Sequence, residues 1–159
     1  MRQFMSIRLK NKKHMTQVKI ISFRYDDEKL FSFASKIREE VFVDEQKVAK
    51  SLEFDGLDNI SNQYLAFVNE KPVGTARWRE TENGIKLERF AVLKSHRNFH
   101  IGQIILQKIL EDVLPLKKYI YLHSQISAVN FYKKNGFVEF GEKFVQANIF
   151  HCKMKFEKE

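Results

Sequence analysis

The order of two hydrophobic periods along the chain constrains its fold more than any other feature. Apolar residues recur at three- and four-residue steps in residues 26–46 and again in 101–113, which predicts two amphipathic helices. The first is expected to begin at Asp26 and Asp27 and to break near residue 43, and Pro115 ends the second. Between them lie three segments rich in β-branched and aromatic residues, 63–69, 73–80 and 85–93, joined by short turns. This order predicts a three-stranded antiparallel meander between two helices.

The flanking segments complete a mixed sheet. Residues 17–25 and 118–124 are rich in strand-forming residues, and 137–140 and 149–156 are expected to form a closing hairpin. Residues 127–136 predict a short helix ending at Gly136, and residues 51–61 are expected to be a loop. We therefore predict an α/β or α+β fold, with a mixed, mostly antiparallel sheet of about six to seven strands flanked by about four helices.

Positive charge is concentrated at the N-terminus. The 159 residues carry a formal net charge of +8, and residues 1–14 contribute five basic residues and no acid, which leaves +3 for the rest. Such a cluster is typical of a solvated tail or, less often, of an arm that binds nucleic acid. We expect residues 1–17 to form a basic, flexible tail and residues 18–156 to form one domain, with nucleic acid not a partner.

Cysteine content and apolar runs indicate the compartment. The single cysteine, Cys152, cannot form a disulfide within the chain, which favours a reducing environment. No apolar run approaches the roughly 20 residues that span a bilayer, and no segment has the pattern of a signal peptide. The sequence therefore predicts a cytoplasmic protein without a membrane partner. No metal is expected, because the histidines lack cysteine or carboxylate neighbours at ligand spacing.

Residues 96–106, HRNFHIGQIIL, join the third strand of the meander to the second helix. A strand, a glycine-bearing turn and a helix start place unpaired backbone N–H groups at the positive end of the helix dipole, where phosphate binds. The Walker motif and the G-x-G-x-x-G dinucleotide motif are both absent from the sequence. By itself the stretch fits either a phosphate cradle or a helix start at which Gly102 eases packing.

The surrounding motifs resemble those of the GNAT superfamily of acetyl-CoA-dependent N-acetyltransferases, across roughly residues 18–156. The loop of that family reads Gln/Arg-x-x-Gly-x-Gly/Ala; Arg97 and Gly102 match it, whereas His100 stands at the first glycine. A second family motif is Ala-x-x-Phe/Leu-Tyr-x-Lys/Arg-x-Gly-Phe, and it is matched by Ala128, Phe131, Tyr132, Lys134, Gly136 and Phe137.

The resemblance implies the GNAT fold and acetyl-CoA as co-substrate. In that family the strand before the loop pairs with the pantetheine arm, and the loop amides hold the pyrophosphate. The implied coenzyme site consists of Phe90, Ala91, Val92, Arg97, Asn98, Phe99, His100, Ile101, Gly102, Gln103, Gln125, Asn130, Phe131 and Lys134. His100 is expected either to add a hydrogen-bond donor to the phosphate or to remain solvated.

Transfer of an acetyl group to an amine needs an acid for the departing thiolate. The family motif assigns this role to Tyr132, for which the alternative is an aromatic ring packed on the coenzyme. Direct attack of the amine requires no covalent acyl-enzyme. Cys152 is therefore expected to be a small buried hydrophobic residue and not a nucleophile.

The reaction also needs a base, because a primary amine is protonated at neutral pH. Glu88 is the first choice, since strand alternation is expected to place Glu88, Phe90 and Val92 on one face. A surface carboxylate paired with a neighbouring cation is the alternative. His123 and His151 are the other candidate bases, and each is alternatively a structural histidine.

Residues 37–48, 53–58, 122–125 and 148–154 are similar to motifs of the ElaA-like subgroup of this superfamily. The likeness implies an acceptor site formed by Arg38, Glu45, Gln46, Glu53, Asp55 and Asp58, in which the carboxylates favour a cationic amine. A solvated, charged helix and loop is the alternative interpretation.

We therefore predict an acetyl-CoA-dependent N-acetyltransferase that acts on a primary amine of a small molecule in a ternary complex, as a monomer or homodimer. The substitution at His100 motivates one alternative, a coenzyme A-binding module with little turnover. The basic N-terminus motivates another, a protein that binds nucleic acid.

Overall fold

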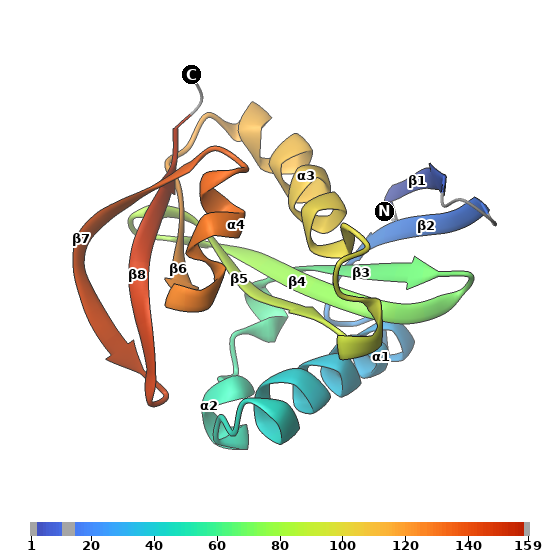
Figure 1. Cartoon of the computed structure of the whole chain (residues 1–159), viewed down its shortest axis with the longest axis horizontal. Helices are drawn as coiled ribbons and strands as arrows, with labels where there is room; N and C mark the ends of the chain where they lie inside the picture. The colour runs from blue at the N-terminus through green and yellow to red at the C-terminus, as the bar shows by residue number, and fades with distance from the viewer. Residues whose placement is uncertain (1–2, 11–14, 158–159) are drawn as a thin grey trace.

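Eight strands form one mixed sheet in the part of the chain that the computed structural model describes, residues 3–10 and 15–157 (Figure 1). They lie in the order β1-β2-β3-β4-β5-β6-β8-β7, and neighbouring strands are antiparallel except β5 and β6. The strands are β1 Gln3–Lys10, β2 Met15–Phe23, β3 Asn62–Val68, β4 Lys71–Thr81, β5 Gly84–Val92, β6 Ile120–Gln125, β7 Phe137–Gln146 and β8 Ile149–Phe156.

Helices cover both faces of the sheet, each over its own apolar core (Figure 1). Helix α1 (Glu28–Arg38) packs on one face, and α3 (Ile101–Val113) and α4 (Val129–Lys133) pack on the other. The remaining helical segments are a π-helix Glu39–Glu45, the single turn α2 (Lys50–Glu53), and 3₁₀ turns at Asp58–Ile60, Lys94–His96, Leu114–Leu116 and Ile126–Ala128. Within the described residues, no helix is long and apolar enough to cross a bilayer.

The predicted fold class is confirmed, with one strand more than expected. The additional strand, β1, lies in the segment expected to be a flexible tail, and it pairs with β2 from Gln3 to Lys10. Met5 and Ile7 alternate toward the sheet core, and the surrounding basic residues obscured this period in the sequence. The tail expectation is therefore wrong for residues 3–10; residues 1–2 and 11–14, also part of that expectation, lie outside the described residues.

The first helix begins as predicted, because the side chain of Asp27 accepts a hydrogen bond from the Leu30 N–H at 3.2 Å. The expected break near residue 43 takes the form of a π-helix from Glu39 to Glu45. Such wide turns are rare and frequently lie at functional sites. The expected loop at residues 51–61 contains α2 and one 3₁₀ turn.

A bulge in β5 changes which residues share a face. In the β4–β5 register Thr75 pairs with Ala91 and Arg77 pairs with Glu88, so two residues of β5 lie opposite one residue of β4. The bulged residue, Arg89, has a φ of 61°. Phe90 and Val92 consequently pack on the core beneath α3, whereas Glu88 contacts Arg77 on the other face. The expectation that Glu88, Phe90 and Val92 share a face is wrong.

Strands β5 and β6 part after only three pairs. They pair in parallel from Ile85 and Ile120 to Leu87 and Leu122, and β6 then continues beside β8 alone. Residues 88–92 of β5 consequently have no β6 partner, and Figure 1 shows β6 turning away from β5. The sheet therefore contains a gap with a free strand edge on one side.

Candidate active site

The predicted catalytic residues meet at the gap between β5 and β6. Glu88 and His123 are the residues that follow the last pair, Leu87 and Leu122, on each strand. Neighbouring residues of paired strands share a face, so both side chains lie on the α1 side of the sheet. Tyr132 of α4 lies on the opposite side, within the core that packs beneath α3. The gap therefore has candidate proton-transfer groups on both faces.

The start of α3 has the geometry predicted for a phosphate cradle. Asn98 and His100 adopt left-handed backbone conformations, with φ of 68° and 59°, and His100 is the N-cap residue without a side-chain capping bond. The backbone N–H groups of residues 101–103 have no hydrogen-bond partner among the described residues. These donors lie at the positive end of the helix dipole. His100 thus keeps the turn that a glycine usually makes.

The space around Gly102 indicates whether this helix start can accommodate a ligand. A Cβ at this position would lie 3.6 Å from the Phe131 ring and 3.9 Å from Val92, which are ordinary contacts. Packing of the protein therefore does not require a glycine there. The missing side chain instead leaves the helix start open to a bound group, as the phosphate interpretation predicts. Two other predicted coenzyme residues, Asn130 and Lys134, are exposed at α4.

Two side-chain contacts connect the π-helix to the coenzyme side. Arg97 donates to both carboxylate oxygens of Glu45 at 2.6 and 2.7 Å and to the Val92 carbonyl at 3.0 Å. The hydrogen bond to Arg97 lowers the pKa of Glu45. Gln125 of β6 donates to the Gln46 amide oxygen at 2.7 Å. The structure thus brings predicted acceptor residues, Glu45 and Gln46, against predicted coenzyme residues.

Tyr132 is buried in an aromatic cluster. Its ring packs edge-to-face against Phe90, Phe131 and Phe137, with centroids 5.0 to 5.8 Å apart. Burial raises the pKa of its phenol above the ordinary value, so the hydroxyl keeps its proton at neutral pH. The hydroxyl has no hydrogen-bond partner among the described residues, so it is a protonated donor that is free to bond a ligand.

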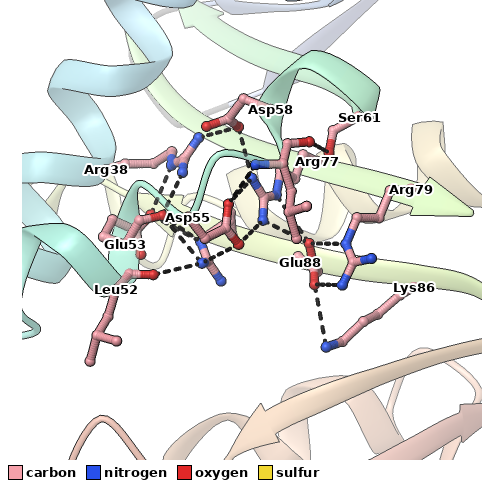
Figure 2. A network of polar contacts seen from close by, with 12 residues as sticks. Arg38, Leu52, Glu53, Asp55, Asp58, Ser61, Arg77, Arg79, Lys86 and Glu88 are labelled. Atoms are coloured by element: carbon pink, nitrogen blue, oxygen red, sulfur yellow. Dashed lines mark hydrogen bonds and ion pairs between the residues drawn. The ribbon is translucent and has the colours of Figure 1, made fainter. Parts of the chain in front are cut away.

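Glu88 lies among cations (Figure 2). Its carboxylate accepts from Arg77 at 3.1 Å and from Arg79 at 3.1 and 3.2 Å, and the Lys86 ammonium lies 3.3 Å away. Burial raises the pKa of Glu88, but the hydrogen bond from Arg79 and the charges of Arg77 and Lys86 outweigh it and hold the pKa below its ordinary value. Glu88 is consequently a weak base.

Most of the predicted acceptor residues form a buried ion-pair network with Arg77 (Figure 2). Arg38 contacts Glu53 at 2.8 Å and Asp58 at 2.7 Å, and Arg77 contacts Asp58 at 2.9 Å and Asp55 at 2.7 Å. The side chains of Arg38 and Glu53 are only 1% and 4% exposed. The network therefore joins α1, the 51–61 segment and the sheet, and its inner members Arg38, Glu53 and Asp58 are closed to a ligand at the surface.

Arg77, Arg79 and Arg89 also belong to the site, and no motif in the sequence marks them. Arg89 donates to the carbonyls of Leu52 and Glu53 and to Asp55. The hairpin turn between β4 and β5 is a sequence signal from which the positions of Arg77 and Arg79 beside Glu88 could have been predicted. Continuing the pairing from that turn places Arg79 opposite Lys86 and Arg77 opposite Glu88.

The pKa of His123 is lowered like that of Glu88, but here burial acts in the same direction as the nearby cations. Burial and the charges of Lys86 and Lys153 lower the pKa of His123 to about 4. Its ring lies edge-on to Phe144, with centroids 5.1 Å apart, and has no hydrogen-bond partner in the part of the chain described. The imidazole is therefore neutral at pH 7 and able to accept a proton.

His151 also contacts Phe144, by stacking on its ring with centroids 5.6 Å apart. Its Nδ1 lies 2.7 Å from the Ile149 carbonyl and must donate to it, which leaves Nε2 as the acceptor. His151 therefore lies one aromatic ring away from His123, as a more distant candidate base.

A cavity of about 460 Å³ lies away from the gap, lined in part by Phe23, Tyr64, Trp78 and Asp112. None of the predicted site residues lines it. Two of its polar groups, Tyr64 and Asp112, hydrogen-bond each other at 2.7 Å. We therefore place the candidate active site at the gap and not in this cavity.

The geometry agrees with the comparison to known families. Residues 12–158 match the profile of the family described as Acetyltransferase (GNAT) domain. The chain belongs to this family. Membership confirms the GNAT fold and makes the protein an acyltransferase, as the motifs around Arg97 and Tyr132 predicted.

Individual relatives support the assignment. The uncharacterized N-acetyltransferase YjcF of Bacillus subtilis (strain 168) is 45% identical over 122 residues, which are 74% of this chain and 86% of YjcF. ElaA of Escherichia coli has the same fold, with a TM-score of 0.78 over 88% of this chain and 99% of ElaA at 24% identity. An aminoglycoside 6′-N-acetyltransferase complexed with coenzyme A has a TM-score of 0.69 over 86% of this chain and 94% of its own, at 16% identity.

Proposed function

We propose that this GNAT protein transfers an acetyl group from acetyl-CoA to the primary amine of a small molecule, by direct attack within a ternary complex. One observation carries the proposal: the gap between β5 and β6 has a neutral imidazole, His123, on one face and a protonated phenol, Tyr132, on the other. A reaction that removes a proton from one reactant and gives one to the other needs such a pair.

The coenzyme fits the residues on the Tyr132 side. The open amides of residues 101–103 would hold the pyrophosphate, and the free edge of β5 at Phe90, Ala91 and Val92 would pair with the pantetheine arm. A structural neighbour complexed with coenzyme A is in keeping with this assignment. When bound, acetyl-CoA supplies an activated thioester, whose C–S bond breaks as the new C–N bond forms.

His123 is the better of the two bases at the gap. It is neutral at pH 7, so its ring nitrogen takes the proton that the attacking amine loses. Glu88 is also unprotonated at pH 7, but its carboxylate oxygens are already paired with three cations, whereas the His123 ring nitrogens have no partner among the described residues. We therefore assign the base to His123, with Glu88 balancing the surrounding positive charge.

Tyr132 completes the proton balance. Its hydroxyl gives a proton to the sulfur as the thiol leaves, and solvent or the proton taken up by His123 restores the phenol. N–H groups on the free edge of β5 are available to donate to the carbonyl oxygen during attack. Because the reaction needs no acyl-enzyme, Cys152, buried in β8, has no role in it.

The test measures thiol release from acetyl-CoA over a panel of primary amines, together with acetyl-CoA binding by calorimetry. We expect turnover of at least one amine, and a fall of about 10²-fold in kcat for Tyr132→Phe with an unchanged coenzyme dissociation constant. Binding without turnover of any amine would indicate a coenzyme-binding module instead. Failure to bind acetyl-CoA would overturn the proposal.

A further inference from the structure

Glu88 and eight other charged side chains form a group on the face of the sheet that carries His123. We call them the charged cluster, and they comprise five cations and four carboxylates: Arg38, Arg77, Arg79, Lys86, Arg89, Glu53, Asp55, Asp58 and Glu88. Each carboxylate has a cationic partner within 2.7 to 3.3 Å. The carboxylates are therefore neutralised inside the cluster, which carries one positive charge in excess.

The positive charge is concentrated where solvent reaches the cluster. The three partly exposed cations are Arg79, Lys86 and Arg89, whose side chains are 16% to 21% exposed. Among the carboxylates only Asp55 is comparably exposed, at 25%, and the other three are 8% or less. The accessible part of the cluster thus presents three cations against one carboxylate.

These exposed cations also retain unused hydrogen-bond donors. Arg79 and Arg89 each use Nε and Nη2 within the cluster, and neither Nη1 has a partner among the described residues. The Lys86 ammonium has one contact, 3.3 Å from Glu88. Figure 2 shows Arg79 and Lys86 meeting Glu88 on the side away from Arg38. Guanidinium and ammonium donors of this kind bind carboxylates and phosphates.

The cluster lies beside the base at the gap. Lys86 is close enough to His123 to lower its pKa, which shows that the positive field reaches the imidazole. Arg89 is the bulged residue of β5, with a φ of 61°, and the bulge places its side chain on the face that carries His123. Without the bulge, the regular alternation of β5 would point the Arg89 side chain into the core beneath α3. A non-glycine residue held in this conformation is a strained feature of the kind found at functional sites.

We propose that the acceptor amine also carries an anionic group, a carboxylate or a phosphate, which binds Arg79, Lys86 and Arg89 while the amine faces His123. This inference rests on the proposed N-acetyltransferase function and specifies its substrate class. It replaces the expectation that the acceptor-side carboxylates select a cationic amine, because those carboxylates are already paired with arginines.

The first experiment uses the unmodified protein and matched amines. Common amino acids are each tested beside the corresponding carboxamide and decarboxylated amine, and phosphoethanolamine is tested beside ethanolamine. We expect kcat/KM for the preferred anionic amine to exceed that of its neutral partner by about tenfold or more, as a charge-assisted hydrogen bond predicts. The carboxylate and phosphate pairs show which anion the site takes.

The outcomes separate the two proposals. Equal or better turnover of neutral or dicationic amines would overturn the anionic acceptor and leave the acetyltransferase function standing. Absence of turnover for every amine would instead overturn the proposed function, and the substrate class with it.

The second experiment changes the cluster. Lys86→Gln removes one charge at a residue with a single cluster contact, and we expect it to raise KM for the anionic amine about tenfold and KM for the matched neutral amine less than twofold. Lys118→Gln is the control, because Lys118 pairs with Glu80 outside the cluster. Equal effects of Lys86→Gln on both amines would contradict the proposal.

Discussion

At the residue scale, the same positive charges lower the pKa of both candidate bases at the gap. Lys86 contacts Glu88 and helps to hold its carboxylate ionised, which makes Glu88 a weak base. Lys86 also lowers the pKa of His123, because the charged imidazolium would be repelled. The charges therefore keep both groups unprotonated at pH 7. His123 differs from Glu88 in that its ring nitrogens have no hydrogen-bond partner among the described residues, whereas both Glu88 oxygens accept from arginines.

Replacement of His123 by glutamine tests this assignment. We expect kcat to fall by about 10²- to 10⁴-fold, the usual contribution of a general base, with little change in acetyl-CoA affinity. For the wild type, kcat/KM corrected for ionisation of the amine should stay level from about pH 5.5 to 8, because the pKa of His123 is about 4. A wild-type kcat/KM that rises with an apparent pKa near 6.5, or full activity of the variant, would contradict the role of His123 as the base.

The backbone conformation of His100 determines how its replacement changes stability and coenzyme binding. Its φ of 59° costs a β-carbon residue about 1 kcal/mol, and glycine adopts the same turn without this strain. We expect His100→Gly to raise the free energy of unfolding by up to about 1 kcal/mol in urea titrations and to tighten acetyl-CoA binding. The matched control His96→Gly, in a right-handed 3₁₀ turn, should destabilise the protein. Weaker coenzyme binding by His100→Gly would identify the imidazole as a phosphate ligand.

At the element scale, the π-helix connects the two halves of the proposed site. It follows directly after α1, and its last residue, Glu45, reaches Arg97 in the coenzyme loop. Gln46, at the end of the π-helix, reaches Gln125 on β6. A regular helix would direct these side chains elsewhere, since a π-turn shifts every following residue around the axis. The widened turn thus places acceptor-side residues in contact with the coenzyme side.

Glu45→Gln tests what the ion pair to Arg97 does. Both side chains are more than a third exposed, so we expect a loss of less than about 1 kcal/mol in unfolding free energy. The two Nη groups of Arg97 would become free for phosphate, while its Nε still binds the Val92 carbonyl. Acetyl-CoA should therefore bind several-fold more tightly at low salt. The control is Glu80→Gln, which breaks another exposed pair, with Lys118. Weaker coenzyme binding by Glu45→Gln alone would mean that the ion pair shapes the loop.

At the scale of the whole molecule, periodic features were predictable from the sequence and departures from them were not. The meander, both amphipathic helices and the loop before α3 follow from hydrophobic period and turn residues. β1 was missed because basic residues surround Met5 and Ile7. No residue marks the bulge at Arg89, which depends on pairing with β4, so the face of Glu88 was assigned wrongly. The ion-pair network joins segments distant in sequence, so that its carboxylates resembled free acceptor ligands.

The network and His123 together predict a loss of stability in acid in two separate ranges of pH. The pKa of folded His123 is about 4, below the ordinary 6.5, so the unfolded chain takes up this proton first and stability falls between pH 6.5 and 4. Burial raises the pKa of Asp55, but hydrogen bonds from Arg77 and the Leu57 N–H outweigh it and hold the pKa at about 2, so a second loss lies between pH 3.8 and 2.

Urea unfolding followed by circular dichroism at pH 7, 5, 4 and 2.5 measures both losses. His123→Gln should abolish the first loss, which we expect to be about 1 to 2 kcal/mol because solvent screens a half-buried ring, and should leave the second. Asp55→Asn should lower stability at pH 7 and reduce the second loss only. A first loss that persists in His123→Gln would show that other groups cause it, and would contradict the lowered pKa of His123.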